Sequence, residues 1–121
     1  MKIMLVDDSR TMRNIQRGVL AQMGHTDICE ACDGTDAISK VMAEAPDLIV
    51  LDWNMPNMDG LSFLKEFRKK NQTAKVIMCT TEAEKPRVVA ALQAGANNYI
   101  IKPFTPDAFQ DRVNKTLGIA A

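Results

Sequence analysis

The chain has 121 residues, which is the size of one domain and too short for two. Its composition, 46% hydrophobic and 25% charged, predicts a globular fold with an apolar core. Fifteen basic and fifteen acidic residues give zero net charge, which argues against nucleic-acid binding because that needs excess positive charge. No apolar run approaches the roughly 20 residues of a membrane span. Acids at Asp7 and Asp8 directly follow the first apolar run, so we expect no signal peptide and a cytoplasmic protein.

Five short apolar runs, rich in Val, Ile and Leu, recur along the chain. Near-continuous apolar runs of this length are typical of strands that are buried on both faces, as in a parallel sheet. We therefore predict strands over residues 3–6, 28–31, 48–51, 76–79 and 99–101.

The segments that follow these runs carry apolar residues at helical spacing, which places them on one face of a helix. Glycines at 24, 95 and 118 suit the left-handed conformation that often ends a helix. Thr105 can cap the last helix, and Pro106 in its first turn loses no hydrogen bond. We expect the buried helix faces to comprise Met12, Ile15, Val19 and Met23; Ala37, Ile38, Val41 and Met42; Leu61, Leu64 and Phe67; Val88, Val89 and Leu92; and Phe109, Val113 and Leu117.

Five strand-then-helix units predict an α/β fold with a parallel sheet. Right-handed crossovers place helices on both faces of such a sheet. A flavodoxin-like, doubly wound sheet with strand order 2-1-3-4-5 accommodates the five units economically. We expect one domain over residues 1–121, with no output domain.

Polar residues end the apolar runs in a way that suggests a site. Asp7 and Asp8 follow the first run, Asp52 the third, Thr80 the fourth and Lys102 the fifth. The carboxyl ends of neighbouring parallel strands meet at one edge of the sheet, where ligands bind in such folds. Three carboxylates there repel one another unless a hard cation such as Mg²⁺ lies between them. The sequence therefore predicts a phosphoryl-transfer site with an aspartate nucleophile, an ammonium and a hydroxyl.

Each of these residues also has an ordinary structural explanation when it is taken alone. Asp7 and Asp8 can stabilise a helix N-terminus, Thr80 can cap a turn, and a lysine usually lies on a solvated surface. What favours the functional interpretation is their joint placement at four strand ends that the topology makes adjacent.

The motifs VDDS at 6–9, LDWNMPNMDG at 51–60, MCTTEA at 78–83 and AGANNYIIKPF at 94–104 occur in order and span the chain. This set resembles response regulator receiver domains, and among them the single-domain chemotaxis regulators. The resemblance implies a signalling switch rather than an enzyme with a diffusible substrate. It also implies a monomer that accepts a phosphoryl group from a CheA-like sensor histidine kinase, binds a flagellar motor switch protein, and is served by a phosphatase.

The resemblance also assigns roles to individual residues. Asp52 would be the phosphoacceptor, Lys102 would bind the phosphoryl group, and Thr80 and Tyr99 would be the switch residues. The Lys102–Pro103 bond would be cis. The remaining implied sets are the Mg²⁺ ligands Asp7, Asp8, Asp52 and the Asn54 carbonyl; the residues that tune dephosphorylation, Asn54 and Glu82; and the partner surface Lys85, Arg87, Tyr99 and Lys102.

Three alternatives remain open from the sequence. A receiver of this kind could act as a phosphoryl shuttle or sink in a relay without a motor target. A flavodoxin-like cofactor protein shares the fold class, but Asp7 and Asp8 after the first strand would repel a cofactor phosphate. A phosphohydrolase with an aspartyl nucleophile typically carries it after the first strand, whereas here Asp52 follows the third.

Overall fold

The computed structural model describes residues 1–81 and 84–118. The chain folds around one five-stranded sheet, and every strand pair in it is parallel. The strand order β2-β1-β3-β4-β5 confirms the predicted topology. The strands are β1 (Ile3–Val6), β2 (Ile28–Ala31), β3 (Leu48–Asp52), β4 (Lys75–Thr80) and β5 (Asn98–Ile101).

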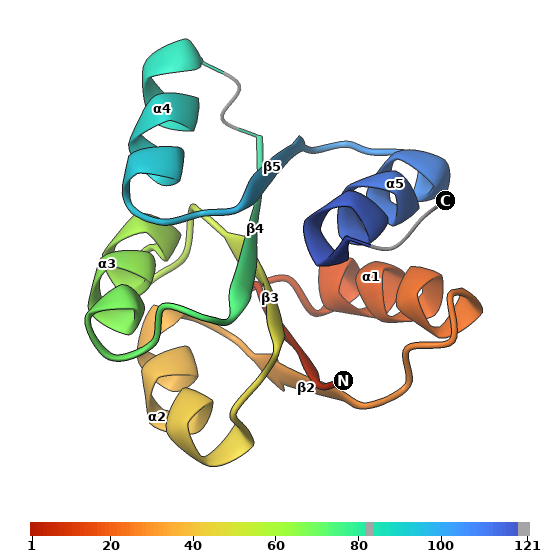
Figure 1. Cartoon of the computed structure of the whole chain (residues 1–121), viewed down its shortest axis with the longest axis horizontal. Coiled ribbons are helices and arrows are strands. Elements are labelled where there is room, and N and C mark those ends of the chain that lie inside the picture. The colour runs from red at the N-terminus through yellow and green to blue at the C-terminus, as the bar shows by residue number, and fades with distance from the viewer. Residues whose placement is uncertain (82–83, 119–121) are drawn as a thin grey trace.

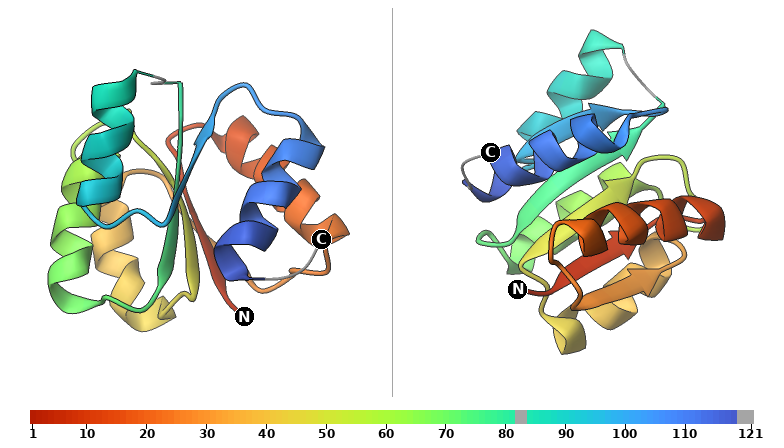
Figure 2. Two further views of the ribbon diagram at one scale, coloured as in Figure 1. Left: turned by 45° about the horizontal axis from the view of Figure 1, so that its top comes forward. Right: turned by 90° about the vertical axis from the view of Figure 1, so that its right-hand side faces the viewer.

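Five helices alternate with the strands and cover the sheet on both sides. Helices α2, α3 and α4 lie on one face, and α1 and α5 lie on the other (Figures 1 and 2). This is the arrangement that right-handed crossovers impose on a doubly wound sheet. The helices are α1 (Arg10–Gln22), α2 (Gly34–Glu44), α3 (Gly60–Lys70), α4 (Lys85–Gln93) and α5 (Pro106–Leu117).

The two faces of the sheet support separate apolar cores. Because side chains alternate along a strand, Met4 and Val6 of β1 face the α2–α4 side, whereas Ile3 and Leu5 face the α1–α5 side. Both sets are almost fully buried. The strands are therefore held from both sides, and their carboxyl ends provide a firm base for polar side chains.

Local sequence explains most of the helix ends. The side chains of Ser9, Asp33, Asp59 and Thr105 each accept a hydrogen bond from a backbone N–H in the first turn of the helix that follows. Gly118 ends α5 in the left-handed region, with a φ of 73°. The expected cap at Thr105 is thus confirmed.

The predicted helix faces are wrong in part. Ile15 in α1 is 48% exposed and Met42 in α2 is 71% exposed, while the polar Gln16 is buried. Only part of the apolar face of α1 or α2 is covered by the sheet. Apolar side chains at the two sides of that face, such as Ile15 and Met42, therefore remain in solvent. The amide nitrogen of Gln16 donates to the sulfur of Cys79 (3.7 Å), while its buried Oε1 has no hydrogen-bond partner among the described residues. The prediction was also wrong for Ile38, Val89 and Leu92, which are exposed as well.

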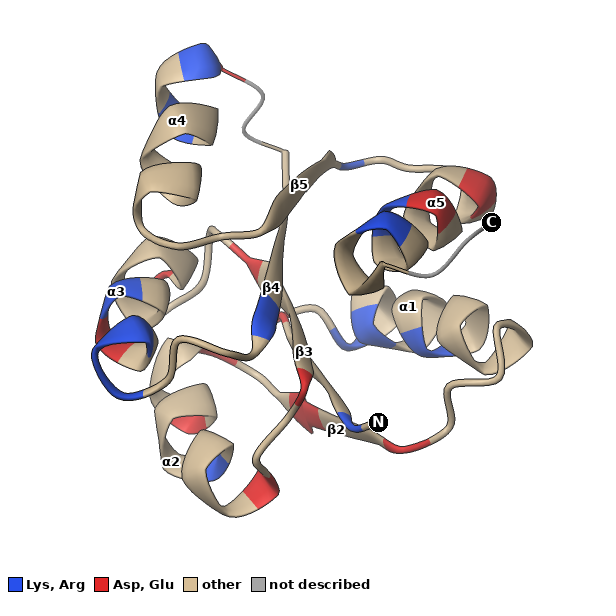
Figure 3. Cartoon of the chain, in the orientation of Figure 1, with Lys and Arg blue, Asp and Glu red and all other residues tan. Residues whose placement is uncertain are grey.

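Charges of both signs are spread over the surface elements. Figure 3 shows Lys or Arg together with Asp or Glu on each of α2, α3 and α5. Within residues 1–81 and 84–118, the helices are too short or too polar to cross a bilayer.

Candidate functional site

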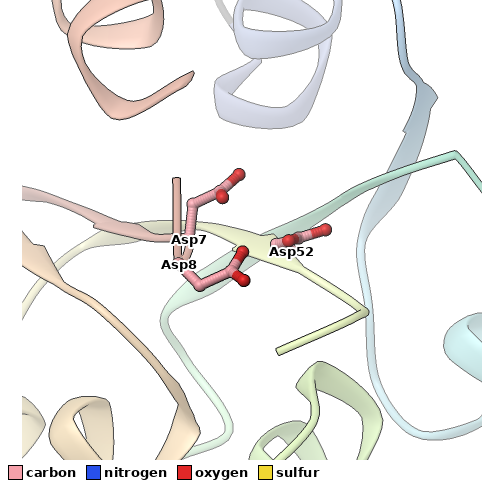
Figure 4. A group of neighbouring side chains, drawn as sticks. All are labelled: Asp7, Asp8 and Asp52. Atoms are coloured by element: carbon pink, nitrogen blue, oxygen red, sulfur yellow. The ribbon is translucent and has the colours of Figure 1, made fainter. Parts of the chain in front are cut away.

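Three aspartates meet at the carboxyl edge of the sheet, as the sequence predicted. Asp7 and Asp8 follow β1, and Asp52 is the last residue of β3, the strand next to β1 (Figure 4). One carboxylate oxygen from each residue lies within 4.8 Å of the others. Asp7 and Asp52 are buried, at 1% and 6% exposure, whereas Asp8 is open to solvent. The cluster is therefore anchored in the protein and accessible from one side.

Asp7 is fixed by several hydrogen bonds. Its Oδ1 accepts from the backbone N–H of Ser9 (2.8 Å), and its own N–H donates to the Ala31 carbonyl (3.1 Å). Its backbone carbonyl accepts from Arg13 (2.5 Å), which also donates to Glu30 (2.8 Å). The sequence reasoning missed Arg13, since a basic residue on a helix gives no signal that it reaches back to the strand before it.

Lys102 supplies positive charge to the cluster. Its Nζ donates to Oδ2 of Asp7 (2.9 Å) and lies 3.2 Å from Oδ1 of Asp52. Burial alone would lower the pKa of Lys102, but the hydrogen bond to Asp7 and the charges of the two carboxylates raise it above its ordinary value. The side chain is therefore a permanent cation between the two buried acids.

The chemistry of Asp52 is set by its surroundings. Burial, followed by repulsion from Asp7, raises the pKa of Asp52 to about 6, although Lys102 acts in the opposite direction. The carboxylate is thus destabilised where it stands. An added cation or a change that removes its charge would relieve this cost.

Thr80 and Lys102 are held together by the backbone. Thr80 ends β4 and is fully buried, and its carbonyl accepts from the N–H of Lys102 (2.8 Å). The Lys102–Pro103 peptide bond is cis, as expected. The hydroxyl-bearing and the ammonium-bearing residue therefore occupy adjacent strand ends beside Asp52, in the predicted arrangement.

The loop after Asp52 is shaped by Gly60 and Asn57, for which the sequence predicted no role. A Cβ on Gly60 would lie 2.1 Å from the carbonyl oxygen of Asp52, and the Gly60 N–H donates to the Trp53 carbonyl (2.8 Å). Asn57, at a φ of 67°, donates to Asp33 (2.8 Å). The first residue of α3 lies so close to the backbone at the end of β3 that only glycine fits at position 60.

The remaining predicted residues lie around this centre. Tyr99 in β5 is 7% exposed and packs in the core on the α2–α4 side. Lys85 and Arg87 are exposed on α4, and Asn54 is exposed two residues after Asp52. Glu82, predicted to tune dephosphorylation, lies outside the described residues.

Sequence comparison agrees with this geometry. The family model for the response regulator receiver domain matches residues 3–114. The chain is 44% identical to chemotaxis protein CheY1 of Helicobacter pylori, over 98% of both chains. It is also 44% identical to a CheY homologue of Campylobacter jejuni, over 98% of this chain and 93% of the other.

Structural comparison gives the same result. The CheY chain in a CheX–CheY–BeF3–Mg complex from Borrelia burgdorferi superposes with a TM-score of 0.93 at 28% identity, covering 97% of this chain and 89% of that one. CheY4 of Vibrio cholerae superposes with a TM-score of 0.88 at 30% identity, covering 95% and 97%.

Proposed function

The chain belongs to the response regulator receiver domain family, and from this premise we propose that it is a phosphorylation-activated switch with Asp52 as its phosphoacceptor. The observation that carries the proposal is the cluster itself: three carboxylates with oxygens within 4.8 Å of one another, bridged in part by Lys102. Asp52 is the member with the raised pKa and lies at the end of a central strand. Repelling charges held this close favour a site that receives a cation and a phosphoryl group.

The residues present fit Mg²⁺. Carboxylate oxygens are the ligands that Mg²⁺ prefers, and it usually keeps several waters and shares its other positions with phosphate. Asp7, Asp8 and Asp52 would hold the ion together with the backbone carbonyl of Asn54, and the open side at Asp8 leaves room for water. When bound, Mg²⁺ would offset the charges of the carboxylates and of an incoming phosphoryl group.

Each side chain of the site has its own role in the phosphoryl transfer. A carboxylate oxygen of Asp52 forms a bond to phosphorus while the bond from phosphorus to the donor nitrogen of a phosphohistidine breaks. Lys102, already within 3.2 Å of Asp52, moves onto a phosphoryl oxygen and stabilises the developing charge. Thr80, at the end of the adjacent strand, donates its hydroxyl to another phosphoryl oxygen. Asn54 and Glu82 would tune the later hydrolysis.

Phosphorylation then changes a surface on the β4–β5 side. A phosphoryl group carries nearly two negative charges and three terminal oxygens in place of the single charge of the carboxylate, and it draws Thr80 and Lys102 towards Asp52. Tyr99, buried in β5, follows the movement of β4, and the surface that includes Lys85 and Arg87 changes shape. The signal is thus a shift of population between two arrangements of α4, β5 and α5.

The likeness to chemotaxis proteins supports a more specific role. The relatives in Helicobacter and Campylobacter carry chemotaxis names, and the Borrelia structure is titled a CheX–CheY complex. We therefore place the chain in the cytoplasm as a monomer. There, a chemotaxis histidine kinase phosphorylates it, the flagellar motor switch binds the phosphorylated form, and a phosphatase resets it. The match over 98% of the Helicobacter protein supports output by binding to a partner.

The single tryptophan provides the test, because Trp53 directly follows Asp52. Mg²⁺ should quench its fluorescence, and beryllium fluoride, which mimics a phosphoryl group, should change the signal further only when Mg²⁺ is present. Asp52→Asn should abolish the second change. Asp27→Asn, an exposed carboxylate on the opposite edge of the sheet, should leave it intact. A full beryllium fluoride response in Asp52→Asn would place the acceptor elsewhere.

The motor target needs a separate experiment. A peptide from a flagellar switch protein should bind the wild-type chain more tightly with Mg²⁺ and beryllium fluoride than without them. Equal binding under both conditions would favour a shuttle or sink for phosphoryl groups over a motor regulator.

A further inference from the structure

Helix α4 is held less firmly to the sheet than the other helices. Of its residues Ala91 alone is buried, whereas α3 buries four residues. Within the described chain, the side chain of its cap residue Glu84 makes no hydrogen bond to the first turn. Val89 and Leu92 lie exposed on its outer side. A helix with so little burial changes position at small cost, so an individual contact can decide where it rests.

Arg87 provides such a contact from the first turn of α4. Its guanidinium carbon lies over the ring of Trp53, 5.4 Å from the ring centroid. A planar guanidinium over an indole is the favourable geometry for a cation–π interaction. Trp53 is itself 6% exposed and packed in the core, so the ring is a fixed platform. The contact therefore links α4 to the residue that follows Asp52.

The arrangement that contains this contact also pairs Asp52 with Lys102. Oδ1 of Asp52 lies 3.2 Å from the ammonium of Lys102, a contact that the proposed movement of Lys102 onto a phosphoryl oxygen would break. An interaction made in one of two conformations opposes any ligand that requires the other, by the free energy of that interaction. A contact between α4 and Trp53 thus bears on how easily Asp52 takes up a phosphoryl group.

We propose that Arg87 is a positioning residue that holds α4 against Trp53 in the unphosphorylated arrangement and thereby sets how readily phosphorylation switches the α4 surface. The inference rests on the proposed function of Asp52 and adds to it a restraint carried by α4. It differs from a role for Arg87 as a surface cation for partners, because such a cation would not alter the affinity of the isolated chain for a phosphoryl group.

Binding of beryllium fluoride in the presence of Mg²⁺ tests the inference, with isothermal titration calorimetry as the measurement because it needs no tryptophan. Arg87→Ala should lower the dissociation constant about two- to five-fold, the effect of losing an exposed cation–π contact. Arg87→Lys, which keeps the charge without the planar group, should fall between Arg87→Ala and wild type. Lys65→Ala removes the same charge from an exposed position of α3, on the same face of the sheet, and should bind as the wild type does.

A double-mutant cycle assigns the effect to the ring contact. Trp53→Phe provides a smaller ring, and Arg87→Ala should have less effect on binding in that background than in the wild type. Equal effects in both backgrounds would contradict the inference. Trp53 emission gives a second measurement: beryllium fluoride should change it less in Arg87→Ala than in Lys65→Ala.

The outcomes separate the inference from the function on which it rests. If Asp52→Asn abolishes binding while Arg87→Ala binds like the wild type or more weakly, Arg87 does not restrain α4 and the inference is wrong. If Asp52→Asn still binds beryllium fluoride, the acceptor itself is misassigned and both proposals fail.

Discussion

Helices α3 and α4 lie on the same face of the sheet but are anchored very differently (Figure 1). In α3, Phe63, Leu64 and Phe67 are buried, and Asp59 caps the first turn by accepting from the Ser62 N–H (2.8 Å). Arg68 ties the end of α3 to the carbonyl of Gly95 (2.9 Å). Helix α4 has Ala91 as its one buried residue and has no comparable side-chain cap in the described chain.

This difference matches the two tasks of a phosphorylation switch. The loop from Asp52 to Gly60 leads into α3, so a firm α3 keeps the proposed acceptor in place. The segment after Thr80 leads into α4, so a loosely held α4 can follow the hydroxyl when it moves. The weakly anchored helix is thus a different element from the one that supports Asp52, although both helices lie on one face of the sheet.

The largest contrast should appear when each helix loses an apolar side chain. Phe63→Ala creates a cavity under α3 and should lower the free energy of unfolding by about 3–5 kcal/mol. Leu92→Ala, at an exposed position of α4, should change it by less than about 0.5 kcal/mol. Urea unfolding measures both. Similar losses for the two variants would show that α4 is anchored as firmly as α3.

A smaller loss is expected at the turn that joins the acceptor strand to α3. Gly60→Ala places a Cβ 2.1 Å from the Asp52 carbonyl oxygen, so the backbone must shift, at a cost of about 1–3 kcal/mol. Because the shift moves Asp52, Mg²⁺ affinity should fall as well. Gly18→Ala is the control: with no described atom within 4 Å, it should stabilise α1 by about 0.5–1 kcal/mol. Unchanged Mg²⁺ affinity in Gly60→Ala would argue against this coupling.

The sequence predicted the strands well because buried parallel strands are apolar along their whole length. It also predicted which residues meet at the carboxyl edge, since Asp7, Asp52, Thr80 and Lys102 each end a run and the strand order makes those ends adjacent. Topology alone brings such residues together, and no knowledge of side-chain contacts is needed.

The contacts that support the site could not be predicted in the same way. Arg13 reaches the Asp7 carbonyl and Arg87 lies over Trp53, but a charged residue on a helix gives no sign of which way it turns. Met42 of α2 was predicted to be buried and is exposed, for a related reason. Apolar spacing shows that a helix has a face but not how much of that face the sheet covers.

The negative charge of Asp52, the proposed acceptor, can be tested by replacing the residue with the neutral asparagine. The raised pKa of Asp52 means that its ionised form destabilises the folded state above a pH of about 6, and that this penalty disappears as the pH falls below about 4. In the absence of Mg²⁺, Asp52→Asn should therefore be more stable at pH 8, by about 1 kcal/mol once solvent screening and the lost contact with Lys102 are included.

The difference should shrink as the pH is lowered through 6 towards 4, which urea unfolding at several pH values measures. Millimolar Mg²⁺ should reverse the order at pH 8, because binding to the folded wild type stabilises it more than the variant. A stability difference that does not change between pH 4 and pH 8 would mean that Asp52 is not strained by its neighbours.

The smallest predicted effects concern the two helices that begin with a proline in the first turn, α4 and α5. Thr105 caps α5 by accepting from the Ala108 N–H (3.1 Å), so Thr105→Ala should cost about 0.5–1 kcal/mol. Glu84 makes no such bond to α4, so Glu84→Ala should be neutral in urea unfolding. Glu84→Thr would supply the missing cap and should slow amide hydrogen exchange in α4. If Glu84→Ala is as costly as Thr105→Ala, then α4 is capped after all, and its freedom to move must come from its shallow burial alone.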